Sequence, residues 1–461
     1  MTSAVFAQID AYIDEHLSTT IDELAQLCAL PSVSAQGHGM DACAQFVQNM
    51  LTRRGFATQT MPTAGYPVVF AEAQGSSAST LLFYNHYDVQ PPEPLDLWES
   101  PPFELTHRTD ENDTALLVAR GVADDKGELM CRLAALDAVR AVMGEFPCHV
   151  KFLVEGEEEI SSPNLPTFIE QHRDLLQADA CIWEFGGVNY QNTPVQYLGL
   201  RGICYVELTA QTATLDAHSG LAGSIFPNAA WRLTWALSTL KGPDEHIRIP
   251  SFYDAVIPPS PRDLVLLGVL PDEAEHYQET YGIARFLKDL SDTELRREEV
   301  FVPTCTICGL TSGYQGPGSK TVLPAQASAK IDFRLVPDQD PDDIVAKLRA
   351  HLDAEGFRDI DITYLGGGRP ARTDPDHPFV SMVRETAADV YGTEMLVWPM
   401  IGGSGPNYPF THHLNVPIST AGVNYPGGRV HAPNENIRVN DFVRATKHIA
   451  RVIVGMREIH G

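Results

Sequence analysis

The chain of 461 residues carries 33 Lys and Arg residues against 60 Asp and Glu residues, which gives a formal net charge of −27. A field of that sign repels nucleic-acid phosphates and anionic lipid surfaces, so neither nucleic acid nor a membrane is an expected partner. With 44% hydrophobic residues the chain can form a folded core, and its length exceeds that of one typical core. We therefore expect two domains, or one domain with a large insertion.

The N-terminal residues lack the basic start and the apolar run of a secretion signal, and no stretch reaches about 18 apolar residues. Eight cysteines are scattered along the chain, as in proteins whose thiols stay reduced. Cys305 and Cys308 form a C-x-x-C pair, but half a zinc ribbon is not a metal site. We expect a cytoplasmic protein with structural thiols.

Strands and helices alternate in the first part of the predicted structure. A helix is expected over residues 9–30, because apolar residues recur there at roughly helical intervals. Pro31 then ends this helix. Short apolar runs typical of buried strands follow, with helical patterns between or after them. The strands are expected at residues 67–71, 80–84, 150–154 and 180–183, and the helices at residues 128–143 and 165–176. This order predicts an α/β fold with a mostly parallel sheet covered by helices on both faces.

From about Cys204 the pattern changes to an α+β character. Strands are predicted at residues 205–210, 327–335 and 360–364, helices at residues 228–240 and 342–355, and a proline-rich region between them. A helix at residues 379–391 and further strand-like runs then resemble the first part again. We therefore predict one domain formed by residues 1–203 and 373–461, interrupted by an inserted domain of residues 204–372.

Several groups of ionisable side chains stand next to these predicted elements. His86 and Asp88 come just after the strand at residues 80–84, where an open parallel sheet places its ligand crevice. Such a pair can supply a metal ligand and a carboxylate that orients this ligand. For this pair alone, a histidine with a purely structural role is the alternative.

Asp124 and Asp125 lie in a glycine-flanked turn directly before the helix that begins near Gly127. A carboxylate fixed in such a turn can bridge two cations with its two oxygens. Alternatively, an acidic residue at this position caps the helix and interacts favourably with its dipole.

The run Glu155-Gly-Glu-Glu-Glu follows a predicted strand directly, Glu184 closes the next strand, and His431 lies in a late turn. Carboxylates packed this closely are unfavourable unless cations are present, although a run of glutamates can simply face solvent. Histidine nitrogens and carboxylate oxygens are ligands that zinc accepts. Taken together, these groups predict a two-metal site, in which one ion polarises a carbonyl and the pair lowers the pKa of a bridging water.

The sequence resembles the dinuclear zinc peptidases of the M20 clan, and the resemblance spans nearly the whole chain. It is most similar to the dipeptidase and carnosinase branch, as four motifs indicate: Gly199-Leu-Arg-Gly, Asp216-Ala-His-Ser-Gly, Lys320-Thr-Val-Leu-Pro and Phe333-Arg-Leu-Val-Pro. The resemblance implies a zinc-exopeptidase-like catalytic domain with an inserted lid and dimerisation domain. It also implies a homodimer and a small peptide-like substrate.

The resemblance further implies two zinc ions (Zn²⁺) per subunit, with Mn²⁺ or Co²⁺ as alternatives. It assigns His86 and Glu184 to the first ion and Glu159 and His431 to the second. Asp124 would bridge the two ions. Many relatives have aspartate at the position of Glu184, so the first ion can be held differently here.

Catalytic roles also follow from the resemblance. Glu158 matches the general base, which takes a proton from the attacking water and passes it to the leaving nitrogen. Asp88 would orient His86, and Glu155 and Glu157 would be supporting or solvated residues. The family register alone decides which of the consecutive glutamates has which role.

Residues of the inserted domain complete the implied site. His218 matches a histidine that reaches the active site of the partner subunit and stabilises the oxyanion, whereas a surface or capping histidine is the alternative. Arg334, Thr321 and Ser404 match positions that hold the substrate's terminal carboxylate or its carbonyl. A guanidinium group suits a carboxylate because it donates to both oxygens, although an ordinary surface ion pair is the alternative for this arginine. Ser161 departs from the family, which often has glycine there.

The predicted function is metal-dependent hydrolysis of a dipeptide or short peptide amide. The nearest alternative is a deacylase of N-acyl amino acids, of the acetylornithine deacetylase or succinyl-diaminopimelate desuccinylase type. A metal-free peptide-binding relative is disfavoured, because no predicted ligand or base is missing from the sequence.

Overall fold

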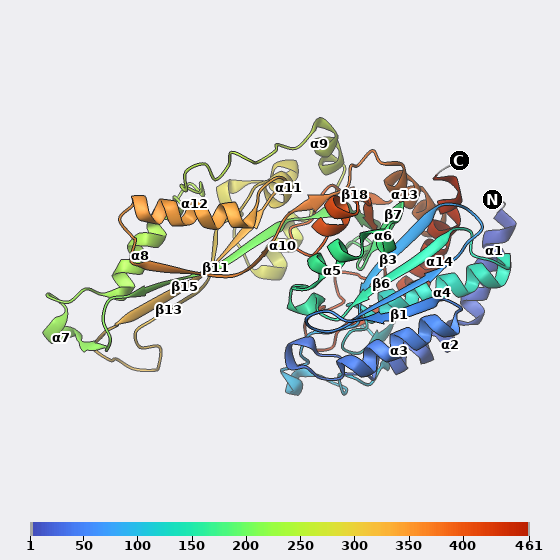
Figure 1. The fold of residues 1–461 in the computed structure, drawn as a ribbon, viewed down its shortest axis with the longest axis horizontal. Helices are drawn as coiled ribbons and strands as arrows, with labels where there is room; N and C mark the ends of the chain where they lie inside the picture. Colours follow the sequence, from blue (N-terminus) through green and yellow to red (C-terminus); the bar gives the residue numbers. More distant parts are fainter. Residues whose placement is uncertain (1–2, 460–461) are drawn as a thin grey trace. The chain divides into compact units, whose positions relative to one another are not determined.

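The computed structural model describes residues 3–459, which divide into two compact units (Figure 1). Unit 2 comprises Leu200–Ala371 and Met400–Gly405, and unit 1 comprises the rest of the described chain. The predicted division places its boundaries after residues 203 and 372. It does not include the short return of the chain at Met400–Gly405, which no composition change marks in the sequence.

Unit 1 is built on a six-stranded sheet with the strand order β1-β2-β6-β3-β7-β19. The bounds are β1 (Ala57–Met61), β2 (Val68–Ala73), β3 (Thr80–His86), β6 (His149–Glu155), β7 (Ala180–Trp183) and β19 (Ile418–Thr420). Strands β6, β3, β7 and β19 run parallel, whereas β1 and β2 join antiparallel at one edge. The α/β prediction is confirmed, with a sheet that is mixed.

The central strands of this sheet are buried along most of their length, which explains their continuous apolar sequences. Phe83 of β3 and Phe152 of β6 stack with their ring centroids 5.0 Å apart. Strand β1 differs, because its polar side chains lie at the sheet edge and are mostly exposed. No apolar pattern therefore predicted it.

Helices pack on this sheet and on one another. The N-terminal segment forms α1 (Ser3–Glu15) and α2 (Leu17–Cys28), so the prediction of one helix over residues 9–30 is wrong at His16, which has non-helical dihedral angles. Helix α4 (Lys126–Met143) contacts β3 and α14 (Val439–Gly455). The remaining helices of unit 1 are α3 (Met40–Arg53), α5 (Leu165–Gln171), α6 (Arg173–Leu176) and α13 (Pro378–Tyr391).

Two smaller sheets complete unit 1. One has the order β20-β5-β4, with β4 (Thr106–Thr109), β5 (Ala115–Val118) and β20 (Asn436–Arg438). The other has the order β18-β9-β8, with β8 (Gly187–Val188), β9 (Pro194–Tyr197) and β18 (Leu396–Trp398). The first of them joins the segment before Asp124 to the segment after His431.

Unit 2 is built on a four-stranded antiparallel sheet with the order β13-β15-β11-β16. Its strands are β11 (Gly202–Gln211), β13 (Thr306–Ser312), β15 (Gln326–Leu335) and β16 (Ile360–Gly368). Side chains of β11 and β15 alternate between buried and more exposed positions, as in a sheet covered on one face. Helices α8 (Ala229–Leu240) and α12 (Pro341–Ala354) pack on β11 and supply that cover.

The remaining elements of unit 2 are short. Strands β12 (Ala217–His218) and β14 (Val322–Leu323) pair beside helix α7 (Ser219–Ala222). The region after the predicted proline-rich stretch forms α9 (Pro261–Gly268), α10 (Ala274–Tyr281) and α11 (Asp292–Phe301). Among residues 3–459, no helix combines the length and the apolar character needed to cross a bilayer. All eight cysteines are free thiols, as predicted.

Candidate metal centre

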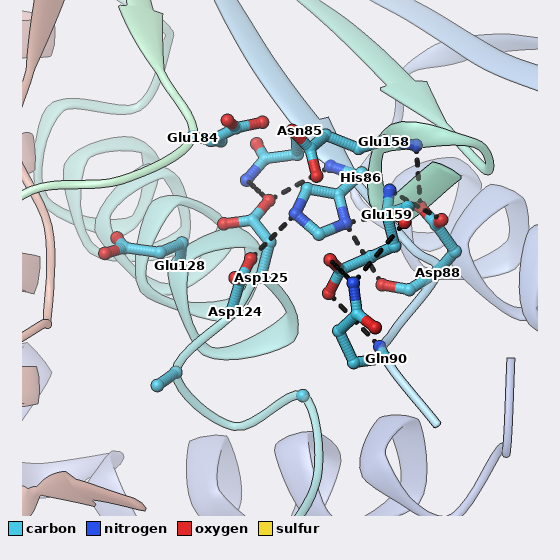
Figure 2. Close-up of polar contacts among 12 residues, drawn as sticks. Asn85, His86, Asp88, Gln90, Asp124, Asp125, Glu128, Glu158, Glu159 and Glu184 are labelled. Carbon is cyan, nitrogen blue, oxygen red and sulfur yellow. Dashed lines mark hydrogen bonds and ion pairs between the residues drawn. The ribbon is translucent and has the colours of Figure 1, made fainter. Parts of the chain in front are cut away.

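Four of the predicted ligands gather where neighbouring strands end, namely His86, Asp124, Glu159 and Glu184 (Figure 2). His86 is the last residue of β3 and lies in register with Glu155, the last residue of β6. A short 3-10 helix, Glu158–Ile160, follows β6, and Glu184 follows β7 directly. Because these three strands are parallel neighbours, their carboxyl ends meet at one edge of the sheet.

Asp124 lies between two histidines. Its Oδ1 is 2.9 Å from Nε2 of His86, and its Oδ2 is 3.1 Å from Nε2 of His431. Nε2 of His431 is also 3.2 Å from Oε2 of Glu159. Ligand atoms of Asp124, Glu159 and His431 all lie within 4.8 Å of one another. This set of oxygen and nitrogen donors fits a divalent metal ion, and the two oxygens of Asp124 face different partners.

Glu184 reaches the same end of the sheet but makes no hydrogen bond to the other predicted ligands. Its Oε1 accepts a hydrogen bond of 3.1 Å from Nε1 of Trp183, whereas its buried Oε2 has no hydrogen-bond partner within the described chain. Figure 2 shows Glu184 on the side of Asn85 and Asp125. A buried carboxylate oxygen without a partner is costly, so a cation fits this position as well.

The histidines of the centre are held by carboxylates. Burial lowers the pKa of His86, but hydrogen bonds to Asp124 and Asp88 outweigh burial and raise this pKa well above 6.5. Hydrogen bonds to Asp124 and Glu159 raise the pKa of His431 to about 10. Burial opposes ionisation of Asp124, yet the two histidines hold the pKa of Asp124 below its usual range. A metal ion bound here displaces the histidine protons, so its affinity rises with pH.

Two glutamates of the centre favour the protonated state, because burial and neighbouring carboxylates raise their pKa values. Burial raises the pKa of Glu158 to about 8, with His86 opposing the shift and the carboxylates of Asp124 and Glu159 adding to it. Burial also raises the pKa of Glu184 well above 4.5, and the charge of Glu158 adds to that shift. Divalent cations among these carboxylates would relieve the repulsion.

Glu158 and Glu159 differ in how the protein holds them. Oε1 and Oε2 of Glu159 accept hydrogen bonds from the backbone N and from Nε2 of Gln90, at 3.2 and 2.9 Å. The carboxylate of Glu158 accepts no hydrogen bond from residues 3–459. One glutamate is therefore fixed beside His431, and its neighbour keeps a carboxylate that can exchange a proton.

Asp88 connects His86 to the glutamate run. Its carbonyl oxygen lies 3.0 Å from Nδ1 of His86, and its Oδ1 lies 3.3 Å from the same nitrogen. Its two carboxylate oxygens also accept the backbone N–H groups of Glu158 and Glu159, at 3.2 and 3.1 Å. This geometry supports an orienting role for Asp88 and extends that role to the loop of Glu158.

The helix-capping alternative for the acidic turn is met in position but not in hydrogen bonding. Asp125 occupies the N-cap position of α4 but makes no capping hydrogen bond with its side chain. Its Oδ2 accepts hydrogen bonds from Nδ2 of Asn85 at 2.6 Å and from the backbone N of His86 at 3.0 Å. Asp125 therefore fixes the end of β3 that carries His86.

The solvated alternative for Glu155 and Glu157 is wrong, because both side chains are buried and hydrogen-bonded. Glu155 accepts hydrogen bonds from Oη of Tyr84 at 2.6 Å and from Oγ of Ser162 at 2.8 Å. Glu157 accepts hydrogen bonds from Nδ2 of Asn164 at 2.8 and 3.1 Å. Both glutamates support the loop that carries Glu158 and Glu159.

The position where the family often has glycine is strained in this chain. Ser161 has a φ of 73°, in the left-handed region that glycine adopts most easily. Its backbone N donates to the carbonyl oxygen of Glu158 at 2.8 Å, so the loop closes with serine in place. The departure leaves Glu158 and Glu159 at the centre.

Sequence interpretation overlooked two residues that organise the centre. Gln90 fixes Glu159 and lies four residues after His86, in the same segment, so its position was a usable signal. Arg132 is fully buried in α4 and donates to carbonyl oxygens of β3 and β7 at 2.7 and 2.5 Å. Arg132 is a single charged residue within a predicted helix, and nothing in the sequence indicates that its side chain is buried.

Four predicted residues lie in unit 2, and two of them are in direct contact. Nη1 of Arg334 donates to Oγ of Ser404 at 2.8 Å, and its Nε donates to Oδ2 of Asp332 at 2.9 Å. The surface-ion-pair alternative is thus partly realised. Nη2 of Arg334 makes no hydrogen bond within residues 3–459, so its N–H groups are available to bind another molecule.

The other two predicted residues of unit 2, His218 and Thr321, also lie together. His218 pairs with Val322 between β12 and β14, and the backbone N of Ser219 donates to the carbonyl oxygen of Thr321 at 3.1 Å. Nδ1 of His218 accepts from the backbone N of Gly220 at 3.0 Å, as in the capping alternative. A neutral imidazole that accepts at Nδ1 carries its proton on Nε2, which is then a donor.

These two pairs of residues lie at opposite ends of β15. Arg334 is near its C-terminal end, whereas β14 with Thr321 precedes its N-terminal residue Gln326. Gln326 and Arg334 are eight residue steps apart along this strand, which corresponds to roughly 26 Å. Within one chain, Arg334 and Thr321 therefore lie far apart, although the resemblance assigns both of them to the same substrate.

Histidine nitrogens and carboxylate oxygens at the ends of parallel strands are donors of the kind that metal-dependent hydrolases use. The chain belongs to the peptidase family M20/M25/M40, whose model matches residues 82–454. The resemblance to M20 peptidases is confirmed, and the protein is a metallopeptidase.

Curated relatives and a solved structure agree with this family. The chain is 27% identical over 478 residues to the Cys-Gly metallodipeptidase DUG1 of Saccharomyces cerevisiae, covering 97% of this chain and 96% of that protein. It is 25% identical over 498 residues to the Beta-Ala-His dipeptidase of Homo sapiens, covering 99% and 94%. The M20 family metallo-carboxypeptidase from Sulfolobus solfataricus matches with 35% identity and a TM-score of 0.89, covering 95% of this chain and 99% of that one.

Proposed function

We propose that this metallopeptidase hydrolyses the amide bond of a dipeptide or a similarly short peptide, with two zinc ions per chain. The observation that carries the proposal is the carboxylate of Asp124, whose two oxygens face His86 and His431 separately. The dipeptidase activities for which the curated relatives are named support the substrate class. They do not favour the alternative of an N-acyl amino acid deacylase.

In the proposed centre each ion has its own ligands and shares Asp124. His86 and Glu184 would hold one ion, and Glu159 and His431 would hold the other. Metal held by these residues would act as a Lewis acid on the substrate carbonyl and would make the attacking water easier to deprotonate. Manganese or cobalt can occupy the same oxygen and nitrogen donors, so the resident metal is decided by affinity and supply.

Glu158 carries the proton in the proposed reaction. Its carboxylate takes a proton from the attacking water, and the carboxylic acid then gives this proton to the leaving nitrogen. Asp88 fixes the backbone of Glu158, while the carboxylate itself stays free to move the proton.

Arg334 is the proposed partner of the substrate's terminal carboxylate. Ser404 and Asp332 hold two of its donor positions and so orient the guanidinium group, which leaves Nη2 to bind the substrate. A charge-assisted hydrogen bond of this kind is stronger than a neutral one and directional.

The proposed enzyme acts as a homodimer in which His218 and Thr321 serve the partner subunit. One dipeptide spans only about 7 Å, so it cannot touch both ends of β15 in a single chain. Two chains can bring the two residue pairs to one substrate. Trp231 and Trp235 of α8 support a subunit contact, because their side chains are 57% and 53% exposed. The two rings stack with their centroids 5.8 Å apart.

The substrate proposal predicts a strong requirement for a free terminal carboxylate. Amidation of a dipeptide's carboxyl group should lower kcat/KM by roughly 10²-fold or more, since it removes charge-assisted hydrogen bonds. Arg334→Ala should lose most of that discrimination. Arg297→Ala is the matched control, because Arg297 forms only an exposed ion pair within α11. This variant should keep the discrimination between free and amidated dipeptides. Comparing the kcat/KM of each variant for free and amidated dipeptides tests this prediction.

Free and N-acetylated dipeptides then separate the dipeptidase from the deacylase. A higher kcat/KM for the free amine supports the proposal, whereas a preference for acetylated compounds contradicts it and leaves the metal chemistry untouched.

A carboxypeptidase is the second candidate function. The specific observation in its favour is the 35% identity to the archaeal metallo-carboxypeptidase over nearly the whole chain. Peptides of two to five residues distinguish the two activities. A sharp fall in kcat/KM beyond dipeptides supports the dipeptidase, and release of C-terminal residues from the longer peptides at similar rates supports the carboxypeptidase.

A further inference from the structure

Glu435 ends the turn that carries His431, and its carboxylate is buried against the turn that carries Asp124. Its Oε1 accepts the backbone N–H groups of Ala123 and Asp124, at 2.9 and 3.1 Å. Its Oε2 accepts the backbone N–H of Gly121 at 3.0 Å. One carboxylate from the His431 turn therefore holds three amides of the Asp124 turn.

A guanidinium group completes the shell around Glu435. Nη1 of Arg120 donates to Oε2 of Glu435 at 2.6 Å, and both side chains are almost fully buried. Nη2 of Arg120 donates to the carbonyl oxygen of Pro91 at 3.2 Å. Pro91 directly follows Gln90, the residue that holds Glu159, so a third ligand-bearing segment joins the same cluster.

The backbone on both sides of the carboxylate is also fixed. The carbonyl oxygen of Glu435 accepts from the backbone N of Ala119 at 3.1 Å, and Asn436 pairs with Val118 between β20 and β5. The Glu435 side chain thus acts from an anchored backbone position. Its two oxygens accept hydrogen bonds from four donors and so hold the Asp124 turn in place.

We infer that Glu435 is a positioning residue that sets the spacing between the metal ligands Asp124 and His431. The inference rests on the proposed two-metal function, because the spacing matters only if both residues bind metal. Glu435 itself touches neither the ions nor the substrate. It acts through the backbone of Asp124 and through the turn that carries His431.

Glutamine cannot replace the carboxylate in this role. Each oxygen of Glu435 accepts from two donors, and an amide nitrogen in either position would face donors with its own N–H groups. Glu435→Gln keeps the volume of the side chain and removes this complementarity together with the negative charge that faces Arg120. Substitutions in the shell that orients metal ligands typically lower metal affinity by about 10–100-fold.

The matched control is Glu23→Gln. Glu23 also clamps guanidinium groups, because it accepts from Arg54 at 2.7 Å and from Arg53 at 2.8 Å, between α2 and the end of α3. None of its partners belongs to the metal centre. Both variants lose a carboxylate bonded to arginine, so thermal unfolding compares their general destabilisation.

Chelator competition with Zn²⁺ alone measures the affinity of each ion in the wild type and in both variants. We expect Glu435→Gln to bind at least one ion about 10–100-fold more weakly and Glu23→Gln to match the wild type. Equal Zn²⁺ affinities in Glu435→Gln and the wild type overturn the inference. If the wild type itself fails to bind two ions, the proposed function fails instead, and the two failures are distinguishable.

A second variant keeps the inference testable if Glu435→Gln does not fold. Glu435→Asp retains the negative charge that compensates Arg120 but is one methylene shorter, so it cannot reach all four donors. We expect it to fold and to bind Zn²⁺ more weakly than the wild type, with kcat rising towards the wild-type value at saturating Zn²⁺. Wild-type Zn²⁺ affinity in Glu435→Asp would contradict the role.

Discussion

Glu158→Gln is expected to keep both metal ions and to lose about 10²–10⁴-fold in kcat, the range that general acid–base catalysis contributes. The glutamine side chain has nearly the same shape, but it cannot take a proton from water at neutral pH. Because no hydrogen bond from the described residues holds the Glu158 carboxylate, the substitution breaks none of the contacts that fix the ligands. Metal content and steady-state kinetics of the same preparation measure both effects.

Glu159→Gln is the companion variant, because the two glutamates are adjacent and only Glu159 is held beside His431. It should lose or weaken one metal ion, and the activity should recover partly when metal is added in excess. A Glu158→Gln variant that lost a metal, beside a Glu159→Gln variant that kept both, would show that the two roles are exchanged.

His218→Ala is expected to bind both ions normally and to lose roughly 10²–10³-fold in kcat, as when one oxyanion donor is removed. The acceptor role of Nδ1 towards the backbone N of Gly220 places the proton on Nε2, which can then donate to a developing negative charge. Because this loss concerns a donor and not a ligand, KM and metal content should change little. Steady-state kinetics with elemental analysis check the prediction.

Mixing His218→Ala with Glu158→Gln tests whether His218 acts across the dimer. If it does, a mixed dimer contains one site with both residues intact and one site with both replaced. Subunit exchange should therefore restore part of the activity that neither variant has alone. Verified exchange without any recovery would show that His218 acts within its own chain.

Most of the fold was predictable because its elements carry strong local patterns. Strands β3, β6 and β7 are largely buried and have mainly apolar sequences, whereas β11 and β15 alternate between buried and more exposed side chains. Edge strand β1 is polar and exposed, so its pairing with β2 depends on a neighbour that no local pattern reveals. Helix α14 was overlooked although its buried residues recur at helical spacing.

The residues of the candidate site also fall into two groups, those that local patterns reveal and those whose roles depend on distant contacts. Strand ends marked His86 and Glu184, and a glycine-flanked turn marked Asp124, because such positions follow from element order. The contacts that hold them do not, since Arg132, Gln90 and Glu435 act through partners far away in the sequence. The sequence places Glu435 in the His431 turn, but only its hydrogen bonds to residues 121–124 indicate what it does.

The central claim is that two metal ions act together in unit 1, and a titration of the metal-free enzyme with Zn²⁺ tests it most directly. Elemental analysis and dipeptide hydrolysis are followed in the same samples. We expect two ions per chain at saturation, activity that reaches its maximum only as the second ion binds, and complete loss of activity on chelation. Trace metal after reconstitution, or full activity with a single ion per chain, would contradict the account.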